Sequence, residues 1–165
     1  MRWTELPAPI DPVGVAVDDT GVRAVRFGGA PVEAGPLLTT APDGLLGEAR
    51  DQLCRYFAGE AVDFTGLPLS VPGGTDFERA VWKAMSGIPY GEMRTYGEIA
   101  TEVGEPDAAR AVGTACNRNP LPIVVPCHRV VGAGGKLVGF GGGVWRKKIL
   151  LELEARVRIE QEFLF

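Results

Sequence analysis

The sequence changes character at Pro72-Gly73-Gly74, and this break most constrains what the chain can fold into. Before it, short apolar runs alternate with turns rich in Gly, Pro and Asp, which favours strands. After it, apolar residues recur at helical spacing behind helix-start signals. A chain of 165 residues can form two small hydrophobic cores without a metal or a disulfide. We therefore predict an α/β N-terminal domain over residues 1–71 and a mainly α C-terminal domain over residues 72–165.

The N-terminal part has the pattern of a small sheet with one helix. Val13–Val17 and Val22–Phe27 are predicted strands, joined by a turn at residues 18–21. Residues 45–57 carry an apolar stripe at helical spacing and predict a helix. Residues 28–43 are rich in Gly and Pro and predict a loop, and residues 61–71 predict one more strand.

Two capping boxes mark helix starts in the C-terminal part, at Thr75 with Glu78 and at Thr95 with Glu98. They predict a helix from residue 76 and a shorter one over residues 96–103, which Gly104 ends. Further helices are predicted over residues 108–117 and 144–155. The pair 96–103 and 108–117 has the length and turn chemistry of a helix-turn-helix, but taken alone it favours an ordinary helical hairpin in a core, because short helix pairs are common.

Charge is unevenly distributed along the chain. The formal net charge is −4, yet residues 108–151 contain seven cations and no acid. This stretch is either a footprint for a phosphate backbone or a solvated face. No run of about 18 apolar residues predicts a membrane span. No signal peptide is recognisable after Met1, so we expect a cytoplasmic protein.

Three cysteines and one histidine make a poor disulfide framework and a poor zinc site, so we predict no metal. Cys54 and Cys116 are interpreted as small buried hydrophobes. Cys127 differs because His128, which can act as a base near neutral pH, follows it directly. A relay between the two side chains requires a turn or a bridging water.

Two acids on the predicted last helix, Glu154 and Glu152, are candidates to orient the imidazole of His128. Arg129 could hold a thiolate electrostatically or anchor the backbone. From these residues alone, a nucleophilic Cys-His-Glu hydrolase is one hypothesis.

The most specific signal is residues 119–130, NPLPIVVPCHRV, which resembles the active-site signature of the O6-alkylguanine-DNA alkyltransferases. The likeness continues through residues 88–91, 95–97, 108–113 and 139–142, and through Lys147 and residues 150–154. It covers about residues 74–154, whereas the N-terminal part agrees only in size and α/β character. The resemblance implies an RNase H-like N-terminal domain and a C-terminal domain with a winged-helix-like helix-turn-helix.

The resemblance further implies a single-turnover transferase without a cofactor. Cys127 would accept an alkyl group irreversibly from O6-alkylguanine, and also from O4-alkylthymine, in DNA. His128 would take the thiol proton through a water, and Glu154 would orient His128. Tyr96 would contact the guanine and assist its departure, while Asn119 would brace the turn that carries Cys127.

The same resemblance implies how the protein would hold double-stranded DNA. The base would be flipped out from the minor groove, because a duplex hides the alkyl group. Arg110 would fill the gap left in the base stack. Further DNA contacts are expected from Thr95, Ala108, Ala109, Ala111 and Arg118, and the guanine pocket from Val130, Phe140 and Gly141. We expect a monomer that could cluster on DNA.

Phe140 departs from the family pattern, because a tyrosine is common at its position. Stacking against guanine should survive there, but a hydroxyl contact is absent. The ligands of the N-terminal zinc site found in some relatives are missing. A DNA-lesion binder that transfers no alkyl group is the alternative function, and the presence of Cys127 argues against it.

Overall fold

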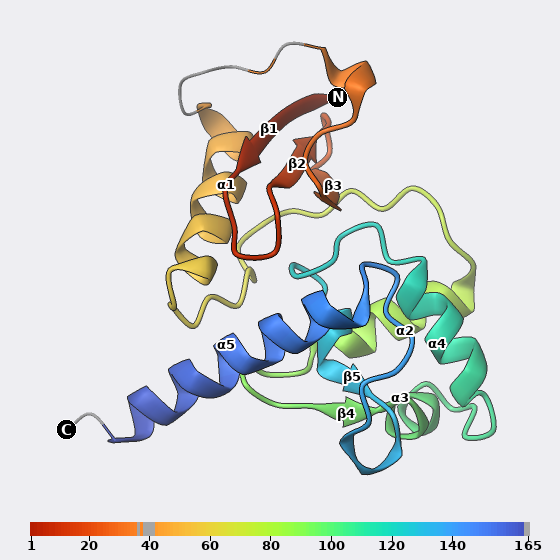
Figure 1. The fold of residues 1–165 in the computed structure, drawn as a ribbon. Coiled ribbons are helices and arrows are strands. Elements are labelled where there is room, and N and C mark those ends of the chain that lie inside the picture. Colours follow the sequence, from red (N-terminus) through yellow and green to blue (C-terminus); the bar gives the residue numbers. More distant parts are fainter. Residues whose placement is uncertain (36, 38–41, 164–165) are drawn as a thin grey trace. The chain divides into compact units, whose positions relative to one another are not determined.

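The computed structural model describes residues 1–35, 37 and 42–163, and these divide into two compact units, Met1–Pro72 and Gly73–Phe165. Figure 1 shows the order of the elements. Part of the predicted loop at residues 28–43, namely residues 36 and 38–41, lies outside the described residues. No described helix is long and apolar enough to cross a membrane.

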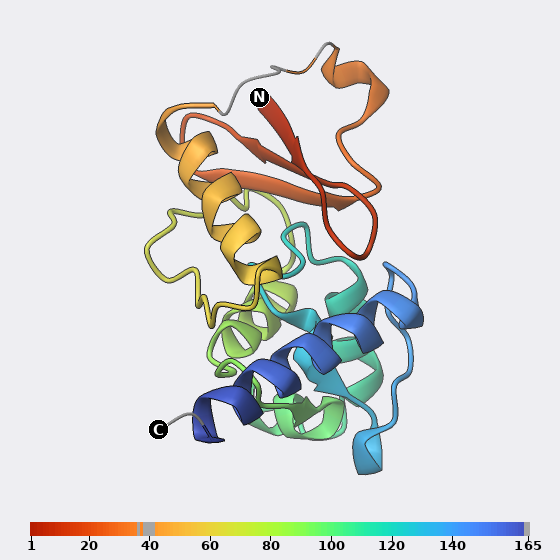
Figure 2. The ribbon, with the colours of Figure 1, turned by 60° about the vertical axis from the view of Figure 1, so that its left-hand side comes forward.

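The first unit is a three-stranded antiparallel sheet with one helix. The strands β1 (Arg2–Leu6), β2 (Val13–Val17) and β3 (Val22–Phe27) lie in sequence order. Every residue of β2 is buried, which fits a central strand. The helix α1 (Gly44–Phe57) contacts all three strands and lies across one face of the sheet (Figure 2).

The turn between β2 and β3 is held by Asp18. Its carboxylate accepts hydrogen bonds from the amides of Thr20 and Gly21 at 2.8 and 3.0 Å. The hydroxyl of Ser70 donates to the same carboxylate at 2.6 Å. A carboxylate that satisfies successive amides favours this tight turn.

Two expectations for this unit were incomplete or wrong. The strand β1 was not predicted, because its buried positions are Thr4 and Leu6, so its inward face is not apolar throughout. The strand predicted over residues 61–71 is absent. Only Leu69 forms a bridge, to Val22, because two prolines lie in or beside that stretch and cannot donate to a ladder.

The second unit is mainly helical. Its helices are α2 (Asp76–Ser86), α3 (Tyr96–Glu102), α4 (Ala109–Asn117) and α5 (Val144–Phe163), as Figure 1 shows. Both predicted capping boxes are formed at the starts of α2 and α3. The short strands β4 (Arg94–Thr95) and β5 (Val130–Val131) pair in parallel. Buried side chains from α2, α3, α4, α5 and the segment between α4 and Cys127 form the core: Val81, Met85, Ile99, Val112, Leu121, Ile123 and Leu150.

The last helix is longer than predicted, since it continues from residue 155 to Phe163. Between residues 156 and 163 only Val157 is buried, so the extension carries no apolar stripe. Polar contacts hold it instead. Arg158 donates to the carbonyl of Gly91 at 3.0 Å and pairs with Glu162 one turn later at 3.3 Å.

Candidate active site

Cys127 is buried at the start of a single 3-10 turn, Cys127–Arg129. Asn119 connects the two ends of the segment that precedes Cys127, residues 121–125. Its side-chain amide donates to the carbonyl of Val125 at 2.8 Å and its oxygen accepts from the amide of Leu121 at 2.9 Å. Asn119 therefore braces the loop that carries the thiol.

The backbone of this loop is sharply bent on both sides of Pro126. The amide of Cys127 donates back to the carbonyl of Val125 at 2.8 Å, across a proline with φ −81° and ψ 68°, which is an inverse γ-turn. Ile123 has φ +74°, a conformation that a β-branched residue rarely adopts. Such strain persists only where the surrounding structure enforces it, and it occurs here four residues from the thiol.

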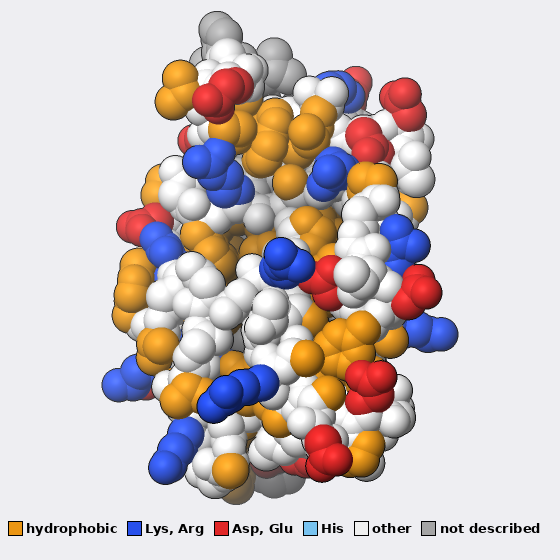
Figure 3. Space-filling view, turned by 90° about the vertical axis from the view of Figure 1, so that its right-hand side faces the viewer, with side chains coloured by type: hydrophobic (Ala, Val, Ile, Leu, Met, Phe, Trp, Pro, Cys, Tyr) orange, Lys and Arg blue, Asp and Glu red, His pale blue; other side chains and the backbone are white. Residues whose placement is uncertain are grey.

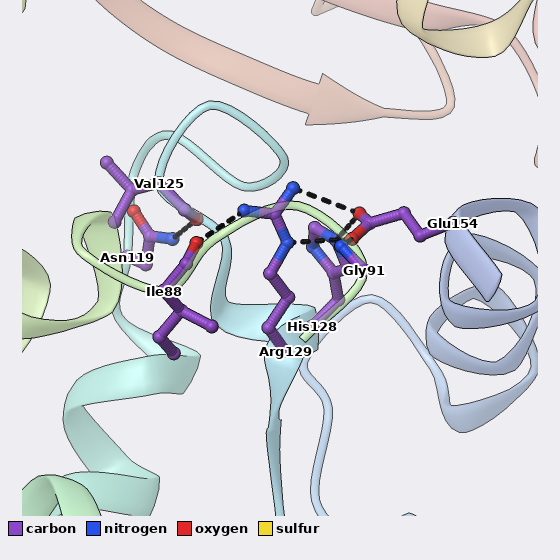
Figure 4. A network of polar contacts seen from close by, with 7 residues as sticks. All are labelled: Ile88, Gly91, Asn119, Val125, His128, Arg129 and Glu154. Carbon is purple, nitrogen blue, oxygen red and sulfur yellow. Dashed lines mark hydrogen bonds and ion pairs between the residues drawn. The ribbon is translucent and has the colours of Figure 1, made fainter. Parts of the chain in front are cut away.

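The residues after Cys127 form a buried polar network with α5 (Figure 4). Nε2 of His128 lies 2.5 Å from Oε2 of Glu154. Arg129 donates from Nε to Oε1 at 2.8 Å and from Nη2 to Oε2 at 3.2 Å. The amide of Gly91 donates to Oε1 at 3.0 Å, and Nη1 of Arg129 donates to the carbonyl of Ile88. One carboxylate thus fixes the orientation of both His128 and Arg129.

Burial and charge set the protonation of this network. Burial raises the pKa of the Cys127 thiol, while a hydrogen bond involving Asn119 and the charge of Lys147 oppose the rise. Burial lowers the pKa of His128, and the hydrogen bond and charge of the Glu154 carboxylate oppose this lowering. Burial alone would raise the pKa of Glu154, but His128 and Arg129 together lower it to about 2. The resting pattern is therefore a thiol beside a neutral imidazole and an ionised carboxylate.

A second buried cation lies beside Tyr96. Lys147 is fully buried, and its Nζ donates to the Tyr96 hydroxyl at 3.3 Å and to the carbonyl of Val138 at 3.4 Å. It also lies over the rings of Tyr96 and Phe140, at 5.5 and 5.8 Å from their centroids. The Tyr96 hydroxyl itself donates to the carbonyl of Val138 at 2.9 Å. Burial raises the pKa of Tyr96 to about 12, so this hydroxyl keeps its proton at neutral pH.

A cavity of about 330 Å³ opens between α3, α4 and the glycine-rich loop over residues 132–143. Tyr96, Arg110 and Gly139 line it, together with Ala109, Gly113, Asn117 and Val138. The loop runs close to the end of α4 at Gly141, where a Cβ would lie 3.6 Å from the Asn117 carbonyl oxygen. The cavity is therefore lined both by Tyr96, which is predicted to contact the guanine, and by Arg110, which is predicted to fill the base stack.

Two family models together cover nearly the whole chain. Residues 1–71 match the ribonuclease-like domain of 6-O-methylguanine DNA methyltransferase, and residues 76–156 match its DNA binding domain. The chain belongs to the 6-O-methylguanine DNA methyltransferase family. This confirms the resemblance found in the sequence, and with it a ribonuclease-like first domain and a DNA-binding second domain.

Individual members of this methyltransferase family are similar along most of their length. A methylated-DNA–protein-cysteine methyltransferase of Mycobacterium tuberculosis is 47% identical over 93% of this chain and 92% of its own. One from Methanosarcina acetivorans is also 47% identical, over 93% of this chain and 98% of its own. The solved M. tuberculosis OGT in complex with DNA has 44% identity and a TM-score of 0.80, covering 95% of this chain and 94% of that one.

The remaining residues expected to matter in this methyltransferase are spread over the second unit. Arg110 and Ala111 are exposed on α4, and Ala108 and Ala109 are partly exposed at its start. Thr95 caps α3 by accepting from the Glu98 amide at 3.0 Å. Arg118 pairs with Glu78 at 3.5 Å. Val130 is buried in β5, directly after the turn that carries Cys127.

Two of the seven cations in the acid-free stretch are not on the surface. Arg129 and Lys147 are 5% and 0% exposed, so they cannot contribute to a phosphate footprint. On the face in Figure 3, Lys and Arg side chains lie scattered among hydrophobic and acidic ones. The uneven charge therefore reflects the buried site as well as the surface.

Lys147 was not assigned to the site from the sequence, and the two roles considered for Arg129 did not include its pairing with Glu154. A signal for Lys147 existed, because Lys147, Leu150 and Glu154 recur at spacings of three and four on α5 and all three are buried. A cation and an anion on the apolar stripe of a helix indicate a buried functional site rather than a core.

Proposed function

We propose that the chain repairs alkylated DNA by a single, irreversible transfer of an alkyl group from O6 of guanine to Sγ of Cys127. The observation that carries this proposal is the position of Cys127, held by Asn119 and followed by His128 on the ionised Glu154. The activity is that of a methylated-DNA–protein-cysteine methyltransferase, and the family relationship supports it.

In this proposal the reaction forms one bond and breaks one bond. The S–C bond of a thioether forms as the O6–C bond of the lesion breaks. His128 accepts the thiol proton through a water and then releases it to solvent, and the departing guanine takes up one proton, so the charge balances. The high pKa of the buried thiol keeps Cys127 protonated until substrate is bound. Water does not cleave a thioether, so each protein acts once.

The departing guanine needs a hydrogen-bond donor, which we assign to Tyr96. In the structure the Tyr96 hydroxyl donates to the Val138 carbonyl. This hydrogen bond must break before the hydroxyl can donate to the guanine. Phe140, which already lies over Lys147, would stack on the guanine. The carbonyls of Cys127 and Val130 and the amide of Gly141 would recognise its edges. A pocket that reads these edges could also admit O4-alkylthymine.

We further propose that α3 and α4 act as a helix-turn-helix of winged-helix type, with α4 in the minor groove. The exposure of Arg110 at the rim of the cavity supports its role in replacing the flipped base. The small side chains of Ala108, Ala109 and Ala111 permit close approach to sugars. Thr95 and the exposed Arg118 lie at the ends of the two helices and are assigned to phosphate contacts.

The acceptor is tested by comparing Cys127→Ser with the matched variant Cys54→Ser. Each protein is incubated with a duplex that carries one O6-methylguanine labelled in its methyl group, and the label on the protein is counted. Cys127→Ser should gain no label, because a hydroxyl of high pKa is a poor nucleophile, whereas Cys54→Ser should match the unaltered protein. Label on Cys127→Ser would refute the proposal, and binding of the lesion without label on any protein would indicate a lesion binder.

A further inference from the structure

The carboxylate that orients His128 already carries a second, permanent partner. Both oxygens of Glu154 accept from the guanidinium of Arg129, and Oε2 is shared between Arg129 and His128. His128, Glu154 and Arg129 are all 5% exposed or less. Water therefore screens these charges poorly, and the sum of the charges within the network decides which protonation state is stable.

The protonation state of His128 that leaves the network without net charge differs between the protein with Arg129 and a protein without it. With Arg129 present, a neutral His128 leaves the three side chains with no net charge, and a protonated His128 leaves one buried positive charge. Without Arg129, the neutral imidazole leaves one buried negative charge, and the protonated imidazole is the balanced form. An uncompensated buried charge is the costly state in each case.

The base is useful for the proposed reaction only in its neutral form. An imidazole that is already protonated cannot accept the proton of the Cys127 thiol. We propose that Arg129 is a positioning residue that keeps His128 neutral at rest by balancing Glu154, so that His128 is available as the base. This inference rests on the proposed function, and it adds a residue whose role no sequence pattern settled.

Other charged and titratable groups face this network from each neighbouring element. The ring of Tyr90 lies 5.5 Å from the Arg129 guanidinium carbon, and burial raises its pKa to about 12, so it stays neutral. From α5, Lys147 acts on His128 in the same sense as Arg129, and the charge of Arg156 reaches Tyr90. Cys127 is a protonated thiol at rest. None of these groups contacts Glu154 as Arg129 does, with two nitrogens on two oxygens.

The test uses the fact that His128 is the single histidine of the chain. Its ring signals in an NMR titration need no assignment and report its ionisation directly. Unaltered protein should show a neutral ring at neutral pH. Arg129→Met should raise the ionisation midpoint of His128 by about one pH unit or more, a tenfold or larger change in its ionisation constant. Arg129→Lys, which keeps the charge, should stay near the unaltered protein.

The matched control is Arg55→Met, which makes the same side-chain change at a half-exposed arginine of the first unit. It should leave the titration of His128 unchanged. An unshifted midpoint in folded Arg129→Met, or a protonated ring in the unaltered protein at neutral pH, would overturn the inference.

Arg129→Met could fail to fold, because it leaves Glu154 uncompensated. The comparison is then repeated in the Glu154→Gln background, which removes that charge. Removing Arg129 there takes away a buried positive charge that disfavours a protonated His128, so the midpoint should again rise, and equal midpoints would contradict the inference.

The rate of alkyl transfer from a free benzylated guanine gives a second readout. The unaltered protein should react at a nearly constant rate above about pH 6.5, the ordinary pKa of histidine, because the pKa of His128 lies below that value. Arg129→Met should lose about tenfold in rate for each pH unit below its raised midpoint. A merely structural role would lower the rate equally at every pH. Failure of transfer in the unaltered protein would refute the proposed function and leave the NMR result standing.

Discussion

At the scale of single residues, the site depends on side chains that hold other side chains. Asn119 fixes both ends of the bent segment before Cys127 through its contacts with the backbone. Glu154 accepts hydrogen bonds from an arginine, a histidine and a backbone amide that lie 25, 26 and 63 residues away in sequence. Adjacency of Cys127 and His128 could be read from the sequence, but these long-range contacts depend on how α5 packs.

The buried network should make the protein less stable in acid. Glu154 has a folded pKa of about 2 against an ordinary 4.5, and the folded pKa of His128 lies below its ordinary 6.5. As pH falls, the unfolded chain therefore takes up both protons first, and stability present above each ordinary value is lost. The free energy of unfolding, measured with urea, should fall below about pH 6.5 and further between about pH 4.5 and 2.

Asp63→Asn is the control for that titration. The pKa of Asp63 is also lowered, by hydrogen bonds from Thr65, but its side chain is exposed. The variant should therefore keep the fall of stability below about pH 6.5 and should differ from the unaltered protein only below about pH 4, where aspartate itself titrates. A profile that is flat between about pH 7.5 and 5 would show that His128 is not kept neutral by the fold.

At the scale of elements, local signals predicted the helix starts well. The capping boxes at Thr75 and Thr95 satisfy backbone amides through neighbours three residues away, so α2 and α3 could be predicted without tertiary knowledge. The strands β4 and β5 could not, because two residues each carry no periodicity and exist only through their pairing. The end of α5 escaped prediction because Arg158 binds the backbone of Gly91 rather than packing in the core.

Thr75→Ala should destabilise the protein by about 1 kcal/mol, because the Glu78 amide at the start of α2 loses its acceptor at 3.1 Å. Thr101→Ala, on the exposed face of α3, is the matched control and should change the free energy of unfolding by less than about 0.5 kcal/mol. Chemical denaturation of both variants measures the difference. Equal losses would mean that the cap contributes nothing of its own.

Arg110→Ala tests the proposed role of α4. Without a side chain to fill the base stack, repair of an alkylated duplex should slow at least tenfold, since flipping costs a few kcal/mol. Reaction with a free benzylated base should hardly change, because no stack is opened. Arg55→Ala, in the first unit, controls for loss of a positive charge. Equal losses of Arg110→Ala on both substrates would contradict base flipping by this residue.

At the scale of the whole molecule, the Pro72-Gly73-Gly74 break coincides with a change from sheet to helices. Family membership is shown by both parts of the chain, although the sequence likeness was recognised only in the second. The reason is physical. The second unit carries its chemistry in a fixed string of residues, whereas the first is defined by burial patterns that many sequences satisfy. A cytoplasmic location and a monomeric state stay predictions.

The central claim is that one sulfur accepts one alkyl group and keeps it. The most direct measurement is a titration of the purified protein with a duplex that carries O6-methylguanine, followed by mass spectrometry of its peptides. We expect that one lesion is repaired per protein and that the peptide with Cys127 gains one CH2. Repair of many lesions by each protein, or loss of the lesion with Cys127 unmodified, would contradict it.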